Sequence, residues 1–237
     1  MNEDYAARDH GLRDIDLYAR TKYRMTIDWL RELPVGSTLA NVGCGSGVFN
    51  EMAVDAGFVV AGYEPDPAAY QLALQHLPSH DCTVEPVGLH DIPTDDTSSA
   101  VVMHDVLEHL DDEDAAVGQL RRIVAPDGRV VISVPAMPSL FGLHDEMLGH
   151  FRRYTRQTLR RALEPSFEIV RLRAFGFAFI PLTLYYSRWR RRPYPLEHTA
   201  DGGFGARLVQ AVCGFERRVA LPIGTSLMCE ARPRRGA

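Results

Sequence analysis

The sequence predicts an α/β fold in which a mostly parallel sheet carries helices on both faces. Short apolar runs alternate with amphipathic stretches over the first 135 residues, as they do where each strand is followed by a crossover helix. A glycine-rich loop, GCGSG at 43–47, follows the first apolar run. The 237 residues suffice for one core, and no repeat or low-complexity linker divides them, so we expect a single domain over 1–237.

Apolar runs mark the expected strands. The run at 58–63 is continuous in apolar residues, which is typical of a parallel strand buried on both faces. In chain order, the predicted strands cover residues 38–42, 58–63, 83–87, 100–103, 129–134, 167–172 and 226–231.

Helical spacing and capping residues mark the expected helices. The first ends before Pro34, while Asp66 and Thr155 are good N-caps for two later ones. A turn is expected at Pro126, Asp127 and Gly128. The predicted helices cover residues 14–33, 48–56, 67–77, 113–124, 155–163 and 207–219.

Three segments lie outside the regular alternation. Residues 1–37 are expected to form an N-terminal helical lid, and 137–154 a long loop of the kind that is usually functional or disordered. An apolar helix is expected at 174–192. We therefore predict insertions on the substrate side at 136–166 and 174–220.

The glycine loop predicts a cofactor site, because glycine lets the backbone approach a ligand closely. A dinucleotide fingerprint, GxGxxG, would place its third glycine where Val48 stands. The phosphate loop of nucleotide hydrolases would need GK[ST], which does not follow. The GxGxG pattern disfavours both cofactor classes.

Four further motifs extend the pattern around the loop: GYEP ending at Pro65, HDVLEHL at 104–110, LRRIVAPDGRVVISVP at 120–135 and HDEMLGHFRRYT at 144–155. Together with the loop, they resemble class I S-adenosylmethionine-dependent methyltransferases. The last motif resembles bacterial small-molecule enzymes related to the ubiquinone-biosynthesis O-methyltransferases. The resemblance implies a Rossmann-like, seven-stranded, mostly parallel sheet with an antiparallel last strand.

The resemblance also implies which residues bind S-adenosylmethionine. Glu64 would accept both ribose hydroxyls, as an acid does in dinucleotide sites. Asn41 stands where the family commonly has an acid, and Leu89 where it often has one near the adenine. The implied cofactor-binding residues are Asn41, Gly43, Cys44, Gly45, Glu64, Pro65, Leu89 and His104.

Methyl transfer to an OH or NH group needs alignment and removal of a proton, so we searched for ionisable side chains near the acceptor. His144 or His150 is a candidate general base, oriented by Asp145, because imidazole titrates near neutral pH. The competing interpretation is a hydrogen-bonded lid without proton chemistry. Tyr154 is a further catalytic candidate, and the substrate-binding candidates are Tyr18 and the anion clamp Arg152 and Arg153.

A second cluster, Asp105, Glu108 and His109, has the spacing that places side chains on one helical face. Some quinone-pathway relatives use a similar set for a divalent metal, which would lower the pKa of an acceptor hydroxyl. The alternative is that Glu108 and His109 brace the turn after the fourth strand. We favour the brace and predict no metal.

Charge is unevenly divided along the chain. Residues 1–150 hold 9 Lys and Arg against 25 Asp and Glu, while 151–237 hold 17 against 6. This predicts an anionic partner for the C-terminal third, the alternative being solvated helix faces. The apolar run at 174–186, with the following RWRRR, indicates either a pocket wall or a peripheral membrane contact through 174–192.

Composition and the N-terminus predict a cytoplasmic protein, and a peripheral location at the inner face of the membrane is the alternative. The four cysteines form no CxxC pair, and the N-terminus has no secretory pattern. No NPPY-like tetrapeptide for stacking a flipped base follows the fourth strand, so we expect no nucleic-acid substrate. No pattern indicates an oligomeric state.

We therefore predict methylation of a small-molecule or lipid-linked, anionic acceptor, most readily at oxygen. The alternatives are an N-methyltransferase and a non-catalytic, cofactor-binding partner subunit of the same fold.

Overall fold

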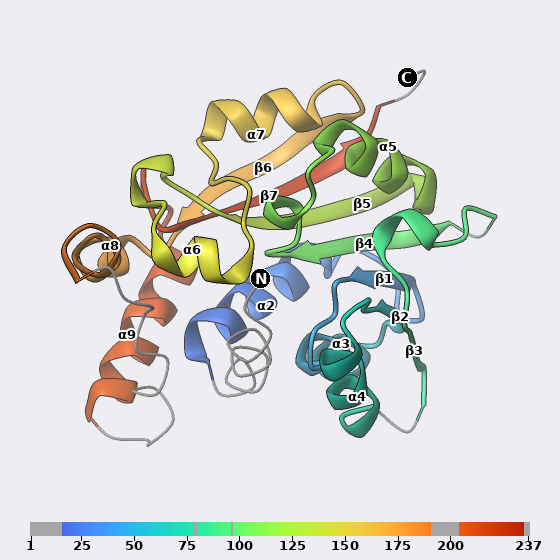
Figure 1. Ribbon diagram of the computed structural model, residues 1–237. Helices are drawn as coiled ribbons and strands as arrows, with labels where there is room; N and C mark the ends of the chain where they lie inside the picture. The colour runs from blue at the N-terminus through green and yellow to red at the C-terminus, as the bar shows by residue number, and fades with distance from the viewer. Residues whose placement is uncertain (1–15, 78–79, 96, 191–203, 235–237) are drawn as a thin grey trace.

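A seven-stranded sheet forms the centre of the molecule (Figure 1). The computed structural model describes residues 16–77, 80–95, 97–190 and 204–234. The strand order is β3-β2-β1-β4-β5-β7-β6. The strands are β1 (Thr38–Val42), β2 (Val59–Tyr63), β3 (Cys82–Glu85), β4 (Ser98–His104), β5 (Val124–Pro135), β6 (Phe167–Phe175) and β7 (Ser226–Pro233).

The first five strands pair in parallel, and the last is antiparallel to both of its neighbours. β1 pairs with β2 on one side and with β4 on the other. β7 pairs antiparallel with β5 and with β6. The sheet predicted from the resemblance, including its antiparallel last strand, is confirmed. Because the strand order reverses between β1 and β4, their carboxyl ends border the crevice where ligands bind in open α/β sheets.

Helices cover both faces of the sheet (Figure 1). On one face, α5 (Glu113–Ile123) and α7 (Arg156–Leu163) pack on alternate strand residues such as Val101 and Ile132. The other face packs against α2 (Leu17–Leu30), α3 (Val48–Asp55) and α9 (Phe204–Arg218). The alternation of side chains along each strand thus produces two cores. α4 (Pro67–Gln75) follows β2, and Asp66 caps it as predicted.

Two expected segments differ in the structure. β5 begins at Val124, so the expected turn at Pro126–Gly128 lies within its bounds, where pairing moves from Ser98↔Val124 to Ala100↔Arg129. The expected long loop at 137–154 is wrong, because it contains α6 (Leu143–Leu148), bounded by two glycines. Six residues are too few to show a helical period in the sequence.

The apolar segment after β6 is not one continuous helix. It forms a 3₁₀ turn, η4 (Phe177–Phe179), then α8 (Ile180–Leu184) and a π-helical segment, η5 (Tyr185–Arg190). Pro181 stands in the first turn of α8, where its missing N–H costs nothing. Among the described residues, no helix has the length and apolar character needed to span a bilayer.

Some predictions concern residues outside the described ranges. Residues 1–15 of the predicted lid, and Arg191 and Arg192 of the predicted membrane contact, lie there. Within the described part, α2 packs into the core beneath α9 through residues such as Met25 and Leu30. The division into lid and insertions stays a prediction.

Candidate active site

The glycine loop between β1 and α3 has the backbone conformation that only glycine adopts readily. Gly43, Gly45 and Gly47 have φ values of 67°, 57° and 87°. A Cβ on Gly43 would lie 2.5 Å from Cγ2 of Val106, which follows β4. The loop therefore lies directly against the chain that leaves β4.

Two side chains hold the loop in place. Asn41 donates to Asn50 Oδ1 over 2.7 Å, so its amide ties β1 to α3. Glu64, at the end of β2, accepts from Gly45 N at 2.8 Å and from Asp66 N at 2.9 Å. Burial raises the pKa of the neighbouring Cys44 thiol to about 12, so this thiol is not a nucleophile at neutral pH.

The loop and Glu64 fit the cofactor that the motifs imply. The loop is a cradle that side chains would fill, and a carboxylate oxygen keeps a second lone pair after accepting one hydrogen bond. Glu64 can therefore hold the loop and accept from ribose hydroxyls at the same time. Leu89, which the resemblance places near the adenine, is buried in the core, while Pro65 and Asp91 border Gly88.

Helix α2 brings its own side chains to the end of β4. His104 Nε2 lies 2.8 Å from Thr26 Oγ1, and its ring contacts Tyr23 and Phe49. His104 is 5% exposed, so its ring forms part of the wall between α2 and the glycine loop. His104 is thus the last residue of β4 and contacts Phe49 of α3, the helix that follows the loop.

Lys22 is a site residue that the sequence analysis missed. Its ammonium contacts the carboxylate of Asp105, whose other oxygen accepts from Ser133 Oγ at 3.0 Å. Asp105 adopts a left-handed φ of 53°, and Lys22 is 3% exposed. One signal in the sequence marks this position: Lys22 is the single lysine among 26 basic residues. The Asp105 carboxylate is therefore bound by Lys22 of α2 and Ser133 of β5.

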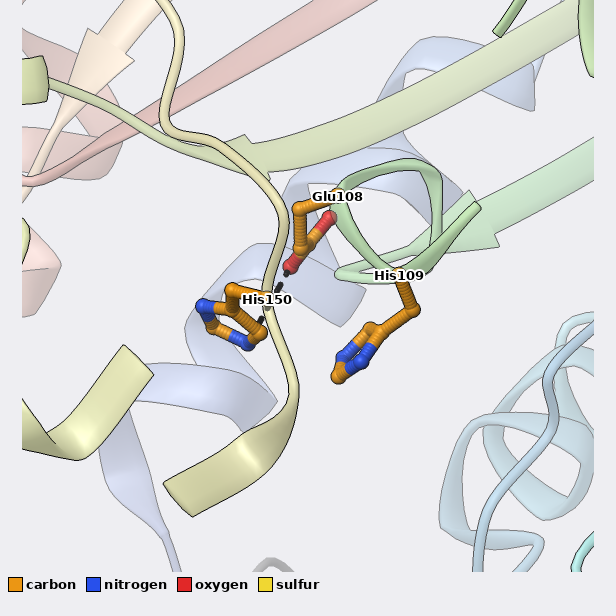
Figure 2. Close-up of side chains that lie close together, drawn as sticks. All are labelled: Glu108, His109 and His150. Carbon is orange, nitrogen blue, oxygen red and sulfur yellow. Dashed lines mark ion pairs between the residues drawn. The ribbon is translucent and has the colours of Figure 1, made fainter. Parts of the chain in front are cut away.

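Glu108, His109 and His150 converge instead (Figure 2). One ligand atom from each lies within 4.8 Å of the others. His150 Nε2 lies 3.9 Å from Glu108 Oε1, and the two imidazole rings stand edge to face at 4.6 Å. Glu108 is fully buried in η2 (Leu107–His109). Glu108 and His109 come from the turn after β4, and His150 comes from the segment after α6. Two imidazoles and one carboxylate are a common ligand set for divalent transition metals.

Asp145 orients His150, as the sequence analysis expected. His150 Nδ1 lies 2.9 Å from Asp145 Oδ1, and Arg153 Nε donates to the same oxygen over 2.7 Å. Burial opposes ionisation, yet the hydrogen bonds from His150 and Arg153 lower the pKa of Asp145 from 3.8 to about 2. An ionised Asp145 accepts the Nδ1 proton, so we assign the lone pair of His150 to Nε2, which faces Glu108. His144 lies half-buried on α6.

Two predicted site tyrosines are hydrogen-bonded to other residues of the protein. Tyr154 lies in the core and donates to Glu113 Oε1 over 2.6 Å, while burial raises the pKa of its phenol. Tyr18 is likewise hydrogen-bonded to Thr225 and Ser226. Both phenols therefore have hydrogen-bond partners within the protein.

The predicted arginine clamp is not assembled. Arg153 is buried against Asp145 and donates to Ala136 O. Arg152 donates to Asp111 O over 2.8 Å and lies 3.7 Å from Glu113. Because both guanidiniums have protein partners, they stabilise the turn that carries His150.

Curated relatives match about half of the chain or less. An uncharacterized methyltransferase of Mycobacterium leprae is 33% identical over 119 residues, which are 50% of this chain and 44% of that protein. A ubiquinone biosynthesis O-methyltransferase of Alkalilimnicola ehrlichii is 33% identical over 105 residues, 41% of each chain. The matches thus span less than half the length of these relatives.

Solved structures match over nearly the whole chain. A putative methyltransferase in complex with the Haloferax volcanii Trm112 methyltransferase activator has a TM-score of 0.66 at 18% identity, covering 99% of this chain and 96% of that one. The N-methyltransferase NodS of Bradyrhizobium japonicum, bound to S-adenosyl-L-homocysteine, has a TM-score of 0.60 at 14% identity, covering 92% and 88%. A family profile described as "Methyltransferase domain" matches residues 16–166. The chain therefore belongs to the methyltransferase domain family and has the fold of S-adenosylmethionine-dependent methyltransferases.

Proposed function

We propose that the chain methylates a hydroxyl group of a small or lipid-linked acceptor, with S-adenosylmethionine as the donor. The observation that carries this proposal is the convergence of Glu108, His109 and His150. Glu108 stands two residues after Val106, which lies against Gly43 of the glycine loop. An acceptor hydroxyl must lose a proton as its oxygen attacks the methyl carbon and the C–S bond breaks toward sulfur. The lone pair that we assign to His150 Nε2 can serve this step in one of two ways: it takes the proton itself, or it binds a cation that lowers the pKa of the hydroxyl.

We propose further that Glu108, His109 and His150 hold a divalent cation, which reverses the preference drawn from the sequence. A buried carboxylate and two imidazoles supply three ligands, and the bond from His150 to Asp145 is the outer-shell contact that orients metal-binding histidines. A bound cation would lower the pKa of an acceptor hydroxyl. Asp105 is excluded from the set because Lys22 and Ser133 engage it.

Metal binding is tested with Co²⁺, whose visible absorption reports coordination by nitrogen and oxygen. We expect metal-free protein to bind one Co²⁺ ion. His109→Gln and His150→Gln should each weaken binding by at least about tenfold, the smallest loss seen when an outer-shell partner is removed. His144→Gln, a histidine of α6 outside the cluster, is the matched control and should leave affinity unchanged. Equal affinity in all three variants would contradict the site.

Nitrogen as the acceptor is the second candidate, supported by the structural likeness to NodS, an N-methyltransferase. A neutral amine needs no base before attack, so the two candidates differ in their dependence on His150. Methyl transfer to a panel of catechols, phenols and amines, with the parent and His150→Gln, separates them. We expect transfer to hydroxyl acceptors and its loss in the variant. Transfer to amines alone, unaffected by the variant, would favour the second candidate.

A partner subunit without activity is the third possibility. It would bind S-adenosylmethionine and give no product with any acceptor class. The buried, oriented His150 argues against it, since Asp145 is fully buried to hold that imidazole.

A further inference from the structure

We propose that an exposed face built by η4, α8, η5 and α9 docks on the surface of an anionic phospholipid bilayer. We call it the docking face. This proposal rests on the proposed function in one respect: a lipid-linked acceptor would approach the site from the docking face.

Helix α9 has two apolar stripes, and the core uses one of them. Ala206 and Cys213 are buried, with Cys213 packed beside α2. A second stripe faces solvent with Leu208, Ala211 and Phe215, at spacings of three and four residues. Leu208 is 55% exposed and Phe215 58% exposed. A helix with apolar residues on two sides has a second partner, because isolated monomers rarely leave such stripes in water.

The exposed stripe continues onto the segment after β6. Phe177 and Ala178 of η4 line one groove of about 370 Å³ together with Ala211 and Phe215 of α9. Glu216 fixes this junction, since its carboxylate accepts from the backbone N–H groups of residues 176, 177 and 178 at 2.6 to 3.0 Å. The apolar surface is therefore continuous from η4 to α9.

Next along the chain, α8 and η5 expose Leu182, Leu184 and Tyr185, and Trp189 is 82% exposed. The Trp189 ring lies 6.3 Å from that of Tyr185. Tryptophan and tyrosine beside aliphatic residues are typical of the bilayer interface, where one end of the ring is apolar and the other is hydrated.

The charges on this face favour an anionic bilayer. Arg190, Arg207 and Arg218 are exposed. Over 176–190 and 205–223, the only acidic residue is Glu216, which is 3% exposed. A second copy of the chain would bring these arginines together, which costs free energy. Phospholipid headgroups would pair with them, at about 1 kcal/mol, or roughly fivefold in affinity, for each arginine.

The docking face adjoins the segment that carries the candidate base. A Cβ on Gly142, at the start of α6, would lie 2.9 Å from Ser187 Cβ, so η5 packs directly on α6. Gly142 N donates to Asp145, which holds His150. In Figure 1, α8, α9 and α6 lie at the same end of the molecule. An acceptor anchored in the bilayer would therefore reach the site from the docked side.

Vesicle flotation tests the proposal directly. We expect the full chain to float with vesicles of phosphatidylglycerol and phosphatidylcholine, and not with phosphatidylcholine alone. Trp189→Ala should reduce binding by about tenfold, since it removes a large interfacial aromatic side chain. Arg207→Gln combined with Arg218→Gln should reduce it by about 25-fold, as two independent headgroup contacts imply. Val35→Ala, which removes an apolar side chain that is 89% exposed and far from the face, is the matched control.

Three results would overturn the proposal: no flotation with either vesicle, equal loss in Trp189→Ala and Val35→Ala, or a parent dimer that Trp189→Ala dissociates without any vesicle binding. Binding of S-adenosylhomocysteine is measured on the same preparations. Flotation that fails while cofactor binding persists contradicts the docking face alone, whereas loss of cofactor binding in the parent contradicts the proposed function.

Discussion

Lys22 and Asp105 form an ion pair between α2 and the residue that follows β4. The Lys22 side chain is 4% exposed and that of Asp105 20% exposed. Removing one partner of a largely buried pair leaves the other charge poorly solvated. The contact therefore ties α2 to the residue that follows β4.

We predict that Lys22→Met lowers the free energy of unfolding by about 3 kcal/mol, because it leaves the Asp105 carboxylate without its cation. Urea denaturation measures the change. The double variant Lys22→Met with Asp105→Asn should recover most of it, since the unpaired charge is then absent. If the single variant is as stable as the parent, the ion pair does not contribute to folding.

Some of these residues are predictable from the sequence and others are not. Glu64 and the three loop glycines follow from local motifs, because each lies within a few residues of a strand end. The partnership of Glu108 with His150 and of Lys22 with Asp105 depends on side chains 42 and 83 residues apart. No periodicity reports such contacts, so only the rarity of lysine marked position 22.

Helix α9 and the turn after β6 are held together by one carboxylate. Glu216 accepts three backbone N–H groups at Gly176, Phe177 and Ala178, and Gly176 has a left-handed φ of 87°. The sequence predicted α9 from its spacing, yet it predicted a continuous helix at 174–192. The bonds to Glu216 explain the difference, because they stop β6 and begin a new turn at that point.

We predict that Glu216→Ala lowers the free energy of unfolding by about 3 kcal/mol, since it leaves three backbone N–H groups, of which that of Gly176 is buried, without their charged acceptor. It should also accelerate hydrogen exchange at those amides. Glu164→Ala removes an exposed partner of Arg160 and serves as the control, with an expected loss below about 1 kcal/mol. Equal losses in the two variants would mean that Glu216 does not brace the junction.

The whole fold was predictable because its signals are redundant. Strand and helix patterns alternate along the sequence as they do in class I methyltransferases. The glycine loop, Glu64 and the later motifs lie at the ends of the predicted strands. The acceptor side was less predictable. Its residues come from α2, the turn after β4 and the α6–α7 segment, and the arginines that the sequence offered for an anion are bonded within the protein.

Some of the basic residues that gather in the C-terminal third of the sequence also lie on one face of the fold. The basic C-terminal third supplies α8 and α9, which lie at one end of the molecule (Figure 1). Three of its arginines, Arg190, Arg207 and Arg218, are exposed on the docking face. The anionic partner expected from composition is therefore proposed to be a membrane surface, in place of a clamped substrate group.

Calorimetric titration with S-adenosylhomocysteine tests the central claim most directly, because the product binds the same cradle without turnover. We predict one site, with binding weakened about tenfold or more by Glu64→Gln, which removes a charged acceptor for the ribose hydroxyls. Glu51→Gln, an exposed acid of α3, is the control and should bind as the parent does. Absence of binding by the parent, or equal affinity in Glu64→Gln, would contradict the account.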